Sequence, residues 1–196
     1  MTSSRSRRFS SACRLRIAWL SYSPEWTAGI RNHRVAARIL PAALLGCACV
    51  PYAGFPALAL TALLCASLYG HNEPPALLQL PERGSSRLLW LKIRTAWRNY
   101  FLLTAPAAAL ALALHPDTAW MAAAWIPFAA LVFLYAVVAK YAAYTPDART
   151  GTRSGTVLTG YLGFLVPPLL PLTLVLIVVY ARRAEKRLNR YLYDYD

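Results

Sequence analysis

The sequence predicts an all-α protein: a polytopic helical bundle in a membrane, with five or six transmembrane segments. Apolar residues make up 58% of the chain, above the roughly 45–50% of a typical soluble domain. They gather in long runs almost without charge, at 39–70, 101–114, 119–139 and 156–181. Helices that are apolar on all sides need lipid or other apolar helices around them, so these runs predict membrane spans.

The charged residues support the same class. The chain carries 21 Lys and Arg against 8 Asp and Glu, a net charge of +13, and the basic residues lie beside the apolar runs, where the positive-inside rule places them. We expect no nucleic-acid partner, because no recognition motif accompanies this charge. The four cysteines show no metal-ligand spacing, so we expect no metal and no cofactor.

The first element is an amphipathic helix over 24–38 that lies in the headgroup layer. Residues 1–23 before it form a basic tail, either cytoplasmic or part of a targeting segment. Arg31, Arg34 and Arg38 would each cost about 2.5–3.5 kcal/mol at the bilayer centre, so 24–38 is not expected to span. The transmembrane domain as a whole is 24–181, and a second basic tail occupies 182–196.

Four spans follow in order. The run 39–70 is interrupted at "PYAGFP" (51–56), which predicts a hairpin of two short spans, 39–52 and 55–70. The third span covers about 99–114, and the fourth covers 119–139 after the turn "HPDT" (115–118). Lys140 ends the fourth span, where we expect its side chain to snorkel to the interface.

Loop charges set the orientation. The segment before the first span has eight basic residues, the 71–98 loop has five and the 140–155 loop has three, whereas the turns at 51–56 and 115–118 have none. The N-terminus and the 71–98 loop are therefore predicted to be cytoplasmic. Within this loop, "PERGSS" (81–86) predicts a break between two short helical pieces.

The last apolar run, 156–181, allows two interpretations. As one tilted span it leaves the five basic residues of the tail outside, against the charge rule. Alternatively, Pro167, Pro168 and Pro171 break it into a re-entrant pair of half-length helices, which returns the tail to the cytoplasm. Charge and the two adjacent prolines favour the break, but the length alone fits one span, so the side of the C-terminus stays open.

The segment "NEPPALLQLPERGSSRLLWLKI" (72–93) resembles the cytoplasmic segment of permease subunits of bacterial ABC-type exporters of the ABC-2 branch. The matching positions are Glu73, Leu77, Leu78, Leu80, Pro81, Leu88, Leu89 and Lys92. The resemblance implies an integral protein of the bacterial plasma (inner) membrane. It also implies that this segment docks on a separate ATPase subunit. The residue types fit such a surface, since Leu77, Leu78 and Leu80 are an apolar patch and Glu82, Arg83 and Arg87 its polar rim; alternatively, the leucines pack on the membrane face or on the third span. Permeases of this group have broken helices before the last span, and we expect this chain to form a homo- or hetero-oligomer.

Three functional classes remain open. A transport subunit is favoured; because no G-x-x-x-x-G-K-[ST] pattern occurs, its ATPase would be a separate chain. A structural or assembly protein of the membrane is the alternative. An integral membrane enzyme is least favoured, because no catalytic residues stand out as a triad or a carboxylate pair.

Overall fold

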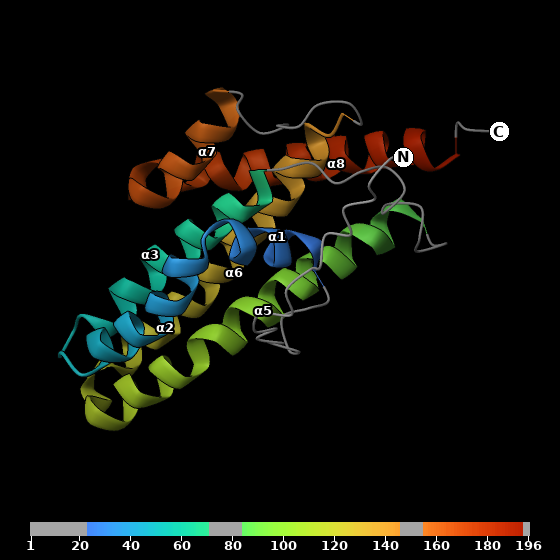
Figure 1. Cartoon of the computed structure of the whole chain (residues 1–196). Helices are drawn as coiled ribbons and strands as arrows, with labels where there is room; N and C mark the ends of the chain where they lie inside the picture. Colours follow the sequence, from blue (N-terminus) through green and yellow to red (C-terminus); the bar gives the residue numbers. More distant parts are fainter. Residues whose placement is uncertain (1–22, 71–83, 146–154, 194–196) are drawn as a thin grey trace, which may run out of the picture.

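The computed structural model describes residues 23–70, 84–145 and 155–193, and nearly all of these residues are helical (Figure 1). The described residues contain no strand, so the all-α prediction is confirmed. One helical segment, Pro116–Ala142, is long and apolar enough to cross a membrane, and Gly54–Gly70 is a shorter apolar segment. The number of spans therefore stays a prediction.

The predicted helix over 24–38 is two helices rather than one. Helix α1 (Pro24–Asn32) ends at His33, whose φ of −119° and ψ of 49° lie outside the helical region, and α2 (Arg34–Ala48) begins at the next residue. Arg34 and Arg38 therefore belong to the same helix as the first predicted span.

The predicted hairpin at 51–56 corresponds to a short turn between α2 and α3 (Gly54–Ala66). Tyr52 in this turn has a φ of 63°, a left-handed conformation that reverses the chain at a small energetic cost for a non-glycine residue. Helix α3 then continues into one turn of 3₁₀ helix, η1 (Ser67–Gly70).

Helix α5 (Ser85–Leu114) is a continuous helix of 30 residues. We expected a helical piece before a third span that begins near residue 99, but the structure places no boundary there. The physical reason is that 85–105 contains neither Gly nor Pro, the residues that most readily interrupt a helix. The first predicted piece, 71–83, lies outside the described residues.

The last apolar run is divided in the structure. Helix α7 (Gly155–Leu165) ends before the 3₁₀ turn η3 (Pro167–Leu169), and α8 (Leu170–Tyr193) begins directly after it. Two adjacent prolines remove two N–H donors, which explains the break. The basic tail that begins at residue 182 is helical up to Tyr193, as the continuation of α8.

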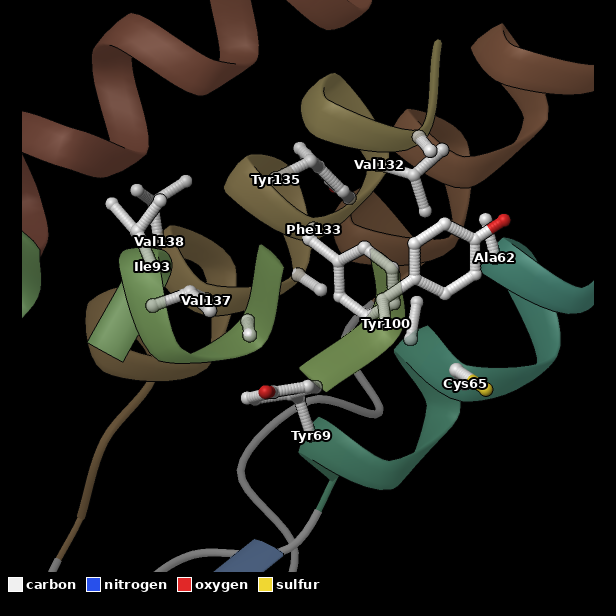
Figure 2. Packing of buried hydrophobic residues seen from close by; sticks show 14 of the residues in the cluster. Ala62, Cys65, Tyr69, Ile93, Tyr100, Val132, Phe133, Tyr135, Val137 and Val138 are labelled. Atoms are coloured by element: carbon white, nitrogen blue, oxygen red, sulfur yellow. The ribbon is translucent and has the colours of Figure 1, made fainter. Parts of the chain in front are cut away.

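Helix α6 (Ala119–Ala142) is the centre of the molecule. It follows α5 through the 3₁₀ turn η2 (Pro116–Thr118) and also contacts α3, α7 and α8 (Figure 1). The buried rings of Tyr100 on α5 and Phe133 on α6 lie 4.9 Å apart between these helices (Figure 2). The Tyr100 hydroxyl donates to the Leu58 carbonyl at 2.7 Å and accepts from Trp125 Nε1 at 2.9 Å, so α3, α5 and α6 share this contact.

Polar groups tie the helices together at both ends of the bundle. At one end, Tyr52 donates to Asp117 at 2.7 Å, and His115 Nε2 donates to the Cys49 carbonyl at 3.3 Å. At the other end, Lys92 and Lys140 converge on Glu25. The helical paths from Leu114 to Lys92 and from Ala119 to Lys140 each rise about 32 Å at about 1.5 Å per residue.

The α7–α8 hairpin reaches only part of the way along α6. Arg187 on α8 donates to the Tyr144 carbonyl just after α6, at 3.1 Å. Near the turn of the hairpin, Phe164 contacts Phe128 with ring centroids 5.8 Å apart. Phe128 lies about 18 Å along α6 from Lys140 at about 1.5 Å per residue, so the turn of the hairpin packs near the middle of α6.

Candidate functional site: a buried ion-pair cluster

Three charged side chains from three helices meet where α1, α5 and α6 come together. Lys140 Nζ lies 3.0 Å and Lys92 Nζ 3.4 Å from the same Glu25 oxygen, Oε1. The other carboxylate oxygen, Oε2, accepts from the hydroxyl of Ser23. We call Glu25, Lys92 and Lys140 the ion-pair cluster.

The cluster is shielded from solvent. The side chain of Lys140 is fully buried, that of Glu25 is 3% exposed and that of Lys92 is 16% exposed. Isolated charges at such depth cost several kcal/mol each, and a close counter-charge with hydrogen bonds offsets this cost. Charge compensation by the two lysines therefore helps to hold α1 in this position.

Two of the three charges lie at helix ends, where the helix dipole stabilises them. Glu25 lies in the first turn of α1, next to Pro24, where the helix dipole stabilises a carboxylate. Lys140 lies in the last turn of α6, where the dipole favours a cation. Lys92 lies on α5 among buried residues such as Leu88, Leu89 and Ile93.

Aromatic rings surround the Lys140 ammonium. Its Nζ lies 5.9 Å from the Tyr69 ring centroid and 5.4 Å from that of Tyr141, distances at which the ring face attracts a cation. The Trp26 Nε1 donates to the Tyr69 hydroxyl at 2.9 Å, and the Trp26 ring stacks on Phe133 with centroids 6.4 Å apart. Trp26, the residue after Glu25, thus also packs α1 against the bundle beside the ion-pair cluster.

A second buried polar group lies deeper on α5. Asn99 is fully buried, and neither its amide nitrogen nor its amide oxygen has a hydrogen-bond partner among the residues that the structure describes. It lies seven residues after Lys92, close to the same face of the helix. An unpaired buried amide costs about 1–3 kcal/mol, so Asn99 is expected to destabilise the apolar half of α5.

The structure brings together few of the residues predicted for ATPase docking. Lys92 lies in the ion-pair cluster and Arg87 is exposed on α5, whereas Glu73, Leu77, Leu78, Leu80, Pro81, Glu82 and Arg83 lie outside the described residues. Leu88 and Leu89 are buried in the core rather than exposed for a partner. Pro167 and Pro168 lie in η3, and Pro171 is the second residue of α8.

Sequence reasoning did not find the cluster. Lys140 was expected to snorkel to the interface, but it is buried because Glu25, 115 residues earlier, supplies a counter-charge inside the protein. A usable signal was present: Lys140 is a single lysine at the end of an apolar run, and ionisable residues in such places are functional candidates. Its partner could not be read from sequence spacing.

The cluster can bind and orient an anionic group, since both lysines donate to a carboxylate oxygen. Within the described ranges, no group of three or more His, Cys, Asp or Glu residues could hold a metal ion. No protein-family model, curated protein or solved structure matches this chain.

Proposed function

We propose that the chain is the membrane-embedded subunit of an ABC-type transport system that works with a separate ATPase. The apolar outer surface is the observation that supports the membrane location in this proposal. Large apolar side chains are exposed on α3, α5, α6, α7 and α8, among them Leu64, Leu102, Trp120, Leu158 and Val175. A soluble protein rarely exposes apolar surface so widely, whereas lipid covers it without cost.

The spacing of the polar ends supports the same proposal. Polar contacts at the two ends are separated by about 32 Å along α5 and α6, close to the roughly 30 Å of a bilayer's hydrocarbon core. The segment from the α2–α3 turn to η1 extends between the same two ends. Its turn forms hydrogen bonds with His115 and Asp117 at one end, and Tyr69 in η1 contacts Lys140 at the other.

Helix α2 is shorter than this thickness. From Arg38 to Ala48 it rises only about 15 Å, and Arg38 is exposed. We infer that the Arg38 side chain snorkels toward the basic end and that the bilayer is thinner beside α2, as hydrophobic mismatch requires.

In this arrangement the α7–α8 hairpin is re-entrant. Its turn reaches the level of Phe128, about halfway along α6, and Arg187 returns to the level of Tyr144. The C-terminal end of α8 then lies on the side of the ion-pair cluster, which agrees with the positive-inside rule for the five basic residues after 181.

The ATPase part of the proposal rests on the resemblance of 72–93. Leu77, Leu78 and Leu80 are apolar residues on a segment predicted to face the cytoplasm, and apolar groups in such a place are expected to mark a partner surface. The alternative, an assembly protein without transport, needs no ATPase.

The test is co-purification from native membranes. The tagged chain should retain a protein with a Walker A motif, and Leu78→Asp combined with Glu82→Arg should abolish this retention while the protein stays inserted. Glu185→Arg is the matched control, because Glu185 is an exposed acid on α8 outside the predicted docking segment, and this variant should retain the ATPase. Failure of the unaltered chain to retain any ATPase would favour the assembly role.

A further inference from the structure

Two adjacent side chains make the most deeply buried contacts of helix α1 with the bundle. Glu25 and Trp26 are its only buried residues, whereas Gly29 and Ile30 are half-buried and the rest are exposed. A helix of nine residues is too short to be stable by itself. Its attachment therefore depends mainly on the ion pairs of Glu25 and on the contacts of Trp26 with Tyr69 and Phe133. Ile30 also packs against the core, and Gly29 lies close to Leu68.

The two lysines, in contrast, stand on helices that do not depend on α1. Lys92 belongs to a helix of 30 residues and Lys140 to one of 24 residues, and these two helices pack along each other. The ammonium groups of both lysines lie within 3.4 Å of one oxygen atom, Glu25 Oε1. The rigid part of the molecule thus presents a preformed pair of cations with an aromatic wall.

We propose that Lys92 and Lys140 form a binding site for an exogenous anionic oxygen group, and that the Glu25 carboxylate occupies this site as an internal stand-in. The ligand is a carboxylate or phosphate group that takes the position of the Glu25 carboxylate. Its binding releases α1 from the bundle. This inference does not depend on the proposed ATPase partner, because only the geometry of the cluster carries it.

The surroundings favour an anion over any other ligand. Arg31 on α1 and Arg87 and Arg94 on α5 are exposed, and positive charge of this kind raises the local concentration of anions. Two exposed apolar side chains, Trp90 and Leu91, also lie directly before Lys92 on α5. An anionic oxygen can therefore come from a lipid headgroup or from a free phosphate in solution, and the two sources share the same chemistry.

The test removes the internal competitor. In delipidated protein, Glu25→Gln keeps the size of the side chain but loses its charge, and native mass spectrometry can follow the binding of phosphatidylglycerol. If the α1-released state is less than a tenth populated, the variant should bind at least about tenfold more tightly than the unaltered protein. The control Glu185→Gln removes an exposed acid and should change nothing.

A second variant guards against misfolding. Trp26→Ala removes the apolar anchor of α1 while all charges remain, and it should also bind more tightly. Lys140→Met in the Glu25→Gln background should abolish the gain. An affinity for inorganic phosphate that equals or exceeds the affinity for phosphatidylglycerol identifies a free phosphate as the source, whereas saturable lipid binding that inorganic phosphate does not displace identifies the headgroup.

Two results would overturn the proposal. One is equal affinity of the unaltered protein, Glu25→Gln and Trp26→Ala for phosphatidylglycerol and for inorganic phosphate. The other is an affinity gain in Glu25→Gln that survives Lys140→Met, because the anion would then bind elsewhere, for example on the exposed arginines.

Discussion

Within the ion-pair cluster, the Glu25–Lys140 pair is expected to contribute most to the free energy of unfolding. Replacing Glu25 by Gln leaves a buried ammonium without its carboxylate, and breaking a buried pair in this way costs about 3–5 kcal/mol. The free energy of unfolding, measured by denaturant titration in detergent, should fall by about this amount.

The matched control is Glu185→Gln, which removes an exposed carboxylate from α8. Surface substitutions of this kind change stability by at most about 0.5 kcal/mol. Equal stability losses for the two variants would mean that the Glu25 contacts contribute no more than a surface charge.

At the opposite end, the Tyr52 hydroxyl donates to Asp117. This hydrogen bond, together with the negative charge of Asp117, raises the pKa of Tyr52 above its usual value of 10.0. The neutral phenol is the form that donates, so its stabilising contribution is complete below pH 10 and is lost as the pH rises through the raised pKa.

The comparison of Tyr52→Phe with the unaltered protein measures this contribution. The unaltered protein should have the higher melting temperature at pH 8, and the difference between the two should shrink above pH 10. A difference that does not change with pH would show that the phenol proton is not involved.

At the scale of elements, the α7–α8 hairpin depends on close packing at Gly163. A Cβ atom at this position would collide with the Thr173 hydroxyl and would lie 2.9 Å from the Leu169 carbonyl oxygen. Gly163→Ala should therefore separate α7 from α8 and destabilise the fold by about 1–3 kcal/mol, as overpacking does.

Gly46 on α2 supplies the control, because a Cβ there would meet nothing within 4 Å. Gly46→Ala should be neutral or stabilise by up to about 1 kcal/mol, the usual gain in a helix interior. Thermal unfolding compares both variants, and a neutral Gly163→Ala would contradict the close packing of the hairpin.

Sequence reasoning predicted most elements where the signal is local. The turns near Pro51 and at 115–118 and the break at Pro167 follow from residues that disfavour helix at those positions. The continuity of α5 across residue 98 was missed because the basic residues end there and an apolar run begins. Such a change marks a boundary between environments, and a helix can continue across it. His33 was missed as the break between α1 and α2, since no Gly or Pro marks it.

At the scale of the whole molecule, the site was less predictable than the fold. Lys92 was assigned to a docking surface, but it packs against Glu25, 67 residues earlier. A pairing of this kind depends on how three helices are arranged in space, and neither periodicity nor spacing encodes it. The all-helical class, in contrast, follows from apolar runs and needs no tertiary information.

The central claim is that the two polar ends of the bundle lie on opposite sides of a membrane. Cys49, which is exposed in the turn region at one end, and Ser86, which is exposed at the start of α5, are suitable reporters. Two single-cysteine proteins, one that keeps only Cys49 and one that carries only Ser86→Cys, can be treated in intact cells with a thiol reagent that does not cross membranes. The account predicts that Cys49 reacts in intact cells and that Ser86→Cys reacts only after the membrane is opened; equal reaction of both in intact cells would contradict it.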